Sequence, residues 1–109
     1  MNVRREDHGR GVLLVVEGQV DMHTSPELRR HLRQALAARS TPIVTDLTEV
    51  SFIDSSGLAT LIEALQGVGQ YGGELRLAGL QPVVRNLFQL SNLSTIFQIH
   101  ETRADALGA

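Results

Sequence analysis

Residues 43–65, IVTDLTEVSFIDSSGLATLIEAL, do most to decide the fold of this chain. The stretch begins with residues 43–47, which are mostly apolar and β-branched, as is typical of a buried strand. Its second half repeats apolar residues at i, i+3, i+4 and i+7, namely Leu58, Leu61, Ile62 and Leu65, which predicts an amphipathic helix. Between the two we expect a loop over residues 48–54, with Val50 and Phe52 at alternate positions. A strand that leads into a helix is the repeating unit of an α/β fold.

The same reasoning extends to both sides of this stretch. Residues 12–16, VLLVV, lie between Gly11 and Gly18, which predicts a short strand buried on both faces. The remaining expected elements are an edge strand near Val3, a helix from about Thr24, a strand over residues 74–78, a helix from Pro82 and a short strand over residues 97–99. Strands and helices that alternate at this spacing predict an α/β fold with a mixed, mostly parallel sheet, packed by amphipathic helices on at least one face.

The first of these helices has a clear expected beginning. Thr24 is followed by a proline and, three residues later, by Glu27, which predicts a capping box with Thr24 as the cap. The apolar side of the helix is expected to consist of Leu28, Leu32, Ala35 and Leu36. Its other side carries the basic cluster Arg29, Arg30, His31 and Arg33. This cluster is either a solvated helix face or a contact for an acidic partner surface.

Composition limits the classes of function. The chain has 109 residues, of which 42% are hydrophobic and 20% charged, so we expect a single domain over residues 1–109, with its core at about 11–100 and peripheral termini. The absence of cysteine excludes disulfides and thiolate chemistry. The net charge of -2 disfavours strong binding to nucleic acid, and the longest apolar run, residues 12–16, is too short to span a membrane. We therefore expect a cytoplasmic protein that binds neither nucleic acid nor membrane.

The basic residues are all arginine. There are ten of them and no lysine, which excludes a Schiff-base lysine and the lysine of a P-loop. Guanidinium groups bind phosphate well, so this composition suits phosphate recognition. A GC-rich coding bias produces the same composition without any function, and composition alone does not choose between the two explanations.

The residues at the expected strand-to-helix junction, Asp54, Ser55 and Ser56, are the strongest candidates for a site. Functional sites in open α/β sheets assemble at the carboxyl ends of strands. An aspartate or serine at a helix start is also what capping requires, but one cap residue is enough. A serine that is exposed here and not needed as a cap could accept a phosphate, which would bond the free backbone N–H groups of the same helix.

Two other kinds of site are compatible with the residue types present. Asp21, His23 and Ser55 are the residue types of a Ser-His-Asp hydrolase, but the Gly-x-Ser-x-Gly nucleophile elbow is missing, so we expect no enzyme. The chain has four histidines: His8, His23, His31 and His100. Their spacing fits no ligand pattern, so we expect no metal site and no cofactor.

Four segments together resemble a known family. Asp46-Leu47 leads through an aromatic residue to residues 54–58, DSSGL, and Gly18-Gln19-Val20-Asp21 precedes Thr24 and the first helix. Residues 72–75 and 84–93 follow in the same order. These segments resemble the anti-sigma factor antagonist family, the bacterial STAS domains, whose signature is Asp-Ser-Ser/Thr-Gly-Leu and whose first block is Gly-Glu-Leu/Ile-Asp. The resemblance covers residues 12–99, with Gln19 in place of the family's usual glutamate.

The resemblance implies a partner-switching regulator of transcription in bacterial signalling and stress responses. In this family the unphosphorylated protein binds an anti-sigma factor that is also an ATP-dependent serine kinase, and so frees a sigma factor. Phosphorylation ends the interaction, and a metal-dependent serine phosphatase restores it. By position, the phosphoacceptor is Ser55, and the residues of the surrounding partner-binding loops are Asp21, Thr24, Asp54, Ser56 and Gly57. The alternative is a STAS scaffold module of a larger signalling or transport complex, in which Ser55 is never phosphorylated.

Overall fold

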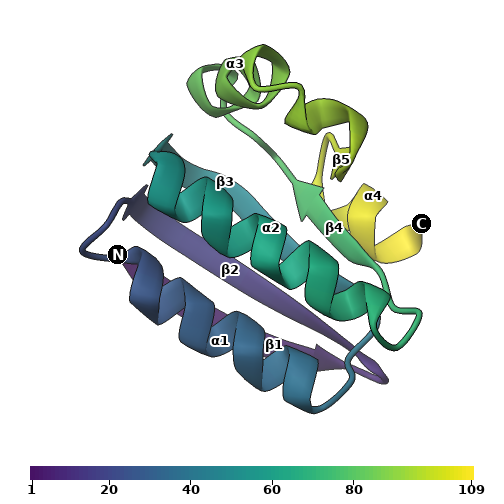
Figure 1. Ribbon diagram of the computed structural model, residues 1–109. Helices are drawn as coiled ribbons and strands as arrows, with labels where there is room; N and C mark the ends of the chain where they lie inside the picture. The colour runs from purple at the N-terminus through teal and green to yellow at the C-terminus, as the bar shows by residue number, and fades with distance from the viewer.

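The computed structural model describes residues 1–109 as one five-stranded sheet with helices packed against it (Figure 1). The strands are β1 (Asn2–His8), β2 (Gly11–Val20), β3 (Ile43–Ile53), β4 (Leu75–Ala78) and β5 (Gln98–His100). The helices are α1 (Ser25–Ala37), α2 (Ser55–Gly69), α3 (Pro82–Leu90) and α4 (Arg103–Gly108), with one short 3-10 helix, η1 (Leu93–Thr95). No helix has the length and apolar character needed to cross a membrane.

The strands lie in the sheet in the order in which they occur along the chain. The edge strand β1 is antiparallel to β2, and the other three neighbouring pairs are parallel. Helices α1, α2 and α3 connect the strands of these parallel pairs. The predicted α/β class and the mixed, mostly parallel sheet are confirmed.

One face of the sheet packs against α1 and α2 (Figure 1). The core between them is formed by side chains that are at most 1% exposed, including Val12, Leu14, Val16, Leu28, Leu32, Leu61 and Ala64. Helix α3 adds Val84 and Phe88 to the same cluster, and the Phe88 ring meets Phe97 edge to face at 5.5 Å between centroids. The apolar side predicted for α1 is confirmed: Leu28, Leu32 and Ala35 are buried, and Leu36 is half-buried. Because β2, β3, β4 and β5 are parallel, their carboxyl ends all lie at the same end of the sheet.

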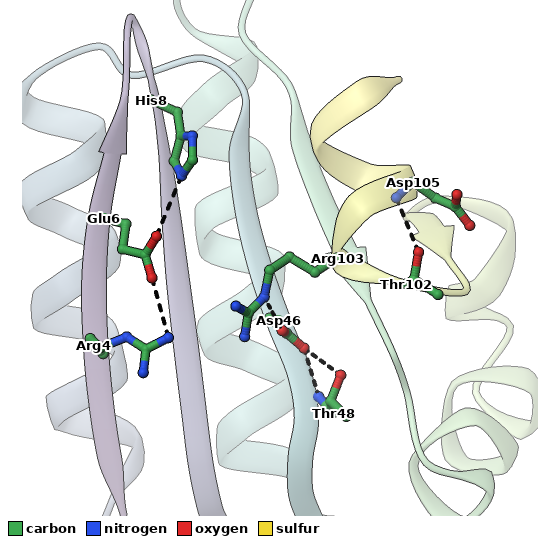
Figure 2. A network of polar contacts seen from close by, with 8 residues as sticks. All are labelled: Arg4, Glu6, His8, Asp46, Thr48, Thr102, Arg103 and Asp105. Atoms are coloured by element: carbon green, nitrogen blue, oxygen red, sulfur yellow. Dashed lines mark hydrogen bonds and ion pairs between the residues drawn. The ribbon is translucent and has the colours of Figure 1, made fainter.

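The C-terminal helix α4 packs on the opposite face of the sheet. Its Ala106 is fully buried in a second cluster with Leu13, Val15 and other sheet residues. The buried Asp46 of β3 accepts a 2.7 Å bond from the Arg103 guanidinium and two bonds from Thr48 (Figure 2). Burial raises the pKa of Asp46, but the bonds from Thr48 and Arg103 more than offset that rise, so the pKa lies below its usual value. The ionised Asp46 therefore anchors α4.

The two ends of the chain belong to the fold. Strand β1 pairs with β2 along its whole length, and its outer face carries Glu6 between Arg4 and His8 (Figure 2). At the other end, the buried Arg76 donates to the carbonyl of Ala106 at 2.9 Å. Residues outside about 11–100 thus contribute to the sheet through β1, the edge strand expected near Val3, and to the second buried cluster through Ala106.

The loop expected over residues 48–54 is also wrong, because β3 continues to Ile53. In the parallel register Val50 lies opposite Gly18, Phe52 opposite Gln19 and Ile53 opposite Val20. Register shifts along β2 and β3 break the regular alternation of buried and exposed residues. A local sequence pattern does not reveal such irregular pairing. Because β3 is longer than expected, Asp54 lies directly at the carboxyl end of the sheet.

Candidate functional site

Two turns, each of which begins with an aspartate, lie side by side at the end of the sheet where the parallel strands β2 and β3 finish. Asp21 directly follows Val20, and Asp54 directly follows Ile53, and Val20 and Ile53 are partners in the register of β2 and β3. The backbone N–H of Asp54 donates to the carbonyl of Val20 at 3.1 Å. The structure therefore brings together the turns that carry Asp21 and Asp54, which the sequence separates by the helix α1 and the strand β3.

Asp54 is the N-cap of α2. Its Oδ1 accepts from the backbone N–H of Ser56 at 2.9 Å and of Gly57 at 3.2 Å, and the Ser56 hydroxyl donates to the same oxygen at 2.6 Å. The Ser56 hydroxyl is the main group that lowers the pKa of Asp54, with backbone N–H groups adding to the effect. Asp54 is therefore a fixed negative charge at the start of the helix.

Ser55 differs from both of its neighbours in this turn. It occupies the first position of α2 and is exposed to solvent. None of the hydrogen bonds that tie Asp54, Ser56 and Gly57 together involves its hydroxyl. The turn thus holds one serine in place and presents the other free.

The expectation that a phosphate on Ser55 bonds several free N–H groups of α2 is wrong. The N–H groups of Ser56 and Gly57 are already bonded to the Asp54 carboxylate, and that of Asp54 is bonded to Val20. Only the N–H of Ser55 itself remains. A dianion on Ser55 therefore meets the Asp54 charge and little compensation from the helix.

Gly57 permits the close approach of α2 to the sheet. It is buried, and a Cβ atom at this position would lie 2.8 Å from side-chain carbons of Ile53 and Val20 and 3.1 Å from the Val20 carbonyl oxygen. Because the Val20 carbonyl also holds the N–H of Asp54, the helix has little room to move away. Gly57 therefore positions the turn that carries Ser55.

The second turn is built from Asp21 and Thr24. Asp21 Oδ1 accepts from the backbone N–H of His23 at 2.9 Å and of Thr24 at 3.1 Å, and the His23 N–H is the main group that lowers the pKa of Asp21. The Thr24 hydroxyl donates to the carbonyl of Gln19 at 2.8 Å and accepts from the N–H of Asp21 at 2.9 Å. The predicted capping box is wrong: Thr24 is the N-cap residue of α1, but its hydroxyl is used within the turn and makes no cap bond.

The residues considered for a Ser-His-Asp hydrolase site and for a metal site do not come together in the structure. The His23 backbone bonds Asp21, but no hydrogen bond joins its ring to Asp21 or Ser55. No group of three or more histidine, aspartate or glutamate side chains is placed to hold a metal ion. In the basic cluster of α1, Arg29 and Arg33 both pair with Glu63 of α2, while Arg30 lies 4.0 Å from Glu27.

An apolar groove lies beside the junction of β3 and α2, and sequence reasoning missed it. It has a volume of about 350 Å³, and its lining includes Phe52, Ile53, Val83 and Leu90. Phe52 is 44% exposed, Val83 63% and Leu90 85%. Exposed apolar side chains that gather in one place mark interaction surfaces. The apolar residue Phe52 in a supposed loop was the signal available in the sequence.

Comparison with known proteins identifies the family. The model of the STAS domain family matches residues 2–106. The chain belongs to the STAS domain family. The expected STAS-like fold is thereby confirmed.

Relatives match along almost the whole STAS domain. The chain is 36% identical over 110 residues to the anti-sigma F factor antagonist of Paenibacillus polymyxa, covering 98% of this chain and 94% of the relative. A crystal structure of an anti-sigma factor antagonist from Mycobacterium paratuberculosis is 29% identical, with a TM-score of 0.89 over 98% of this chain and 91% of that chain.

The Bacillus protein SpoIIAA has the same fold. Its phosphorylated form is 24% identical, with a TM-score of 0.78 over 98% of this chain and 97% of that chain. Its unphosphorylated form is 22% identical, with a TM-score of 0.77 over 98% and 96%. The STAS fold of this chain is thus shared with a protein solved in both states.

Proposed function

We propose that this STAS protein is an anti-sigma factor antagonist that is switched by phosphorylation of Ser55. The unphosphorylated form binds an anti-sigma factor that is also an ATP-dependent serine kinase, and so frees a sigma factor. The observation that carries the proposal is that Ser55 is exposed and unbonded at the start of α2, while the side chains around it are fixed. The names of the relatives, anti-sigma factor antagonists, support the choice of partner.

The surface around Ser55 suits a protein partner. The apolar groove begins at Phe52 and Ile53, directly before Asp54 and Ser55 in the chain. Met22, in the neighbouring turn, is 67% exposed. An interface of this kind, with an apolar part beside a polar rim that contains Asp21 and Asp54, is typical of specific protein complexes. The anti-sigma factor is expected to place apolar side chains in the groove and its kinase site over Ser55.

Phosphorylation breaks such an interface by adding charge. The phosphate brings about -1.5 to -2 charge at neutral pH. It stands beside Asp54 and the neighbouring Asp21, and of the first-turn N–H groups those of Ser56 and Gly57 are already bonded to Asp54. Shifting a complex from almost fully bound to almost fully free requires about 5.5 kcal/mol of differential affinity. Burial of an uncompensated dianion against two carboxylates has an effect of this order.

The switch needs no rearrangement of the protein. Because the N–H groups of Ser56 and Gly57 are already bonded to Asp54, the phosphate can gain at most the N–H of Ser55 without rearranging the turn. The backbone of residues 50–58 is therefore expected to be nearly the same in both states. An NMR or crystal structure of the phosphorylated protein with this segment refolded would contradict this mechanism.

The remaining parts of the proposal follow from the same role. A metal-dependent serine phosphatase removes the phosphate, and the protein works in the cytoplasm as one domain over residues 1–109, without a cofactor or metal and without binding nucleic acid or membrane. It is not an enzyme. A fluorophosphonate probe is expected to leave Ser55 unlabelled, since no histidine ring bonds that hydroxyl.

The test is a reconstituted switch. The protein is added to a complex of a candidate anti-sigma factor and its sigma factor from the same cell, and sigma release is followed with and without ATP. We expect release without ATP, and loss of antagonism with ATP as the protein gains one phosphate. Ser55→Ala should release the sigma factor and stay active with ATP. If the wild-type protein binds but is never phosphorylated by any candidate, the unphosphorylated scaffold module replaces the switch.

A further inference from the structure

A second cavity lies at the other end of the molecule from Ser55. It has a volume of about 470 Å³ and is formed by the turn between β1 and β2, the end of α1 and Tyr71, which follows α2. Ser55 begins α2, whose 15 residues span about 22 Å. The C-terminal ends of α1 and α2 lie together at one end of the molecule, and the β3–α2 junction lies at the other (Figure 1). This cavity is therefore separate from the proposed switch.

The arginines without an acidic partner gather at this cavity. Eight of the ten arginines lie within 4.0 Å of a carboxylate oxygen. The two that do not are Arg10 and Arg39, and both line the cavity together with Arg5. A coding bias would account for arginine in place of lysine along the chain. It does not explain why the two unpaired guanidiniums share one cavity.

The charge of the cavity opposes that of the whole chain. Three guanidiniums and one carboxylate, Asp7, line it, which gives a net charge of +2, whereas the chain carries -2. The C-terminus of α1 contributes about half a negative charge, which leaves the cavity positive. Apart from Ala38 and Tyr71, the lining is polar or glycine. The site thus suits a small polar anion.

Arg39 occupies a position where glycine is the usual residue. It follows the C-cap Ala38 with a φ of 53°, and the backbone bonds Arg39 N–H to Leu36 and Ser40 N–H to Ala35 form a Schellman motif. A side chain in this left-handed conformation costs about 1 kcal/mol relative to glycine. The helix end alone therefore gives no reason for an arginine.

The side chain of Arg39 packs over the ring of Tyr71. Its guanidinium carbon lies 5.4 Å from the centroid of the Tyr71 ring. The Tyr71 hydroxyl donates to the Ser40 carbonyl at 2.7 Å, which fixes the ring. On the other side, the Thr41 N–H donates to the Arg10 carbonyl at 2.9 Å, so the turn that carries Arg10 is tied to the end of α1. The backbone segments that carry Arg10 and Arg39 are thus joined by a hydrogen bond two residues from Arg39.

We propose that this cavity binds a small anion of the phosphate class that carries at least two negative charges. Arg10 and Arg39 supply the contacts, because one guanidinium binds two phosphate oxygens through parallel N–H bonds. The excess positive charge is theirs, since Arg5 is paired with Asp7 at 3.1 Å. The volume lies within the range of small-molecule sites, about 300 to 1,000 Å³.

The test is calorimetric titration of the intact protein with pyrophosphate at low ionic strength, where exposed charges are least screened. We expect saturable binding to one site, with weaker binding of inorganic phosphate and sulfate. Arg39→Gly and Arg10→Gln should each weaken pyrophosphate binding at least about tenfold. Because glycine suits the backbone at position 39, Arg39→Gly should keep or raise the Tm without ligand while binding is lost.

Two controls decide what the titration means. Arg30→Gln removes an exposed arginine elsewhere on α1 and should leave the affinity unchanged within about twofold. Ser55→Glu should also leave it unchanged, which keeps this site independent of the switch. No saturable binding of pyrophosphate, or an equal loss of affinity in Arg30→Gln and Arg39→Gly, would overturn the proposal.

Discussion

The starts of α1 and α2 are built from similar residues and differ in one respect. Each follows a parallel strand of the same pair, each has an aspartate just beyond the strand, and each offers two hydroxyl side chains. In α1 the Thr24 hydroxyl is bonded twice within its turn, and Ser25 is buried. In α2 the Ser56 hydroxyl is bonded to Asp54, but Ser55 is exposed and unbonded.

The difference shows how a cap and a modification site coexist at one helix start. At α1 the hydroxyls stabilise the turn and the packing, so neither is free for chemistry. At α2 the aspartate takes over the capping, which releases one serine. Ser55 is therefore the one hydroxyl among these four that combines exposure with freedom from internal bonds.

The largest expected effect is on partner binding. Ser55→Glu places a charge beside Asp54 in the proposed interface and should weaken binding to the anti-sigma factor at least about 100-fold. Ser55→Ala should bind within about threefold of wild type, because the hydroxyl makes no bond in the protein. Surface plasmon resonance with the immobilised anti-sigma factor measures both. Equal affinities for the Glu and Ala variants would show that the α2 start lies outside the interface.

The next effect concerns the contact that sets α2 against the sheet. Gly57→Ala should lower the free energy of unfolding by about 1 to 2 kcal/mol, because the added Cβ meets Val20 and Ile53. Gly69→Ala in the last turn of α2 is the matched control, since a Cβ there meets nothing within 4 Å. It should raise stability by about 0.5 to 1 kcal/mol. Denaturant unfolding compares the two, and a stabilising Gly57→Ala would mean that α2 is free to shift.

The smallest effect is the acid sensitivity of the α2 cap. The pKa of Asp54 in the folded protein lies below its ordinary value of 3.8, so the ionised side chain stabilises the fold fully above that pH. This stabilisation is lost as pH falls below 3.8 through the lowered pKa. Asp54→Asn should lower the Tm by a few degrees at neutral pH, and the difference in Tm between this variant and wild type should become smaller in acid.

Thermal unfolding by circular dichroism between pH 7 and pH 2 measures this narrowing. Asp7→Asn, on the exposed edge strand, is a control that leaves the cap intact. A gap between Asp54→Asn and wild type that stays constant with pH would contradict the ionised cap.

Much of the fold could be predicted from local patterns, and the failures have physical causes. The buried strand at residues 12–16 was visible as a continuous apolar run, and the amphipathic side of α1 was visible because it follows the helical period. The second half of β3 was not, since its bulged pairing with β2 interrupts the alternation. Helix α4 was missed because its docking depends on Asp46 and Arg76, which are distant in sequence.

The candidate site was predictable to a lesser extent. The residue types and their order pointed to Asp54, Ser55 and Ser56, and the resemblance added Asp21. Which serine is free depends on a hydrogen bond between Ser56 and Asp54 that no pattern of letters specifies. The apolar groove likewise depends on α3 lying against the end of β3, which only the packed structure shows.

The site of phosphorylation can be mapped after incubation of the protein with the anti-sigma kinase and ATP. Tandem mass spectrometry of the wild-type protein and of Ser55→Ala and Ser56→Ala distinguishes the four hydroxyls at the two helix starts. We expect one phosphate on Ser55 in wild type and in Ser56→Ala, and none in Ser55→Ala. Phosphate on Thr24, Ser25 or Ser56, or undiminished phosphorylation of Ser55→Ala, would contradict it.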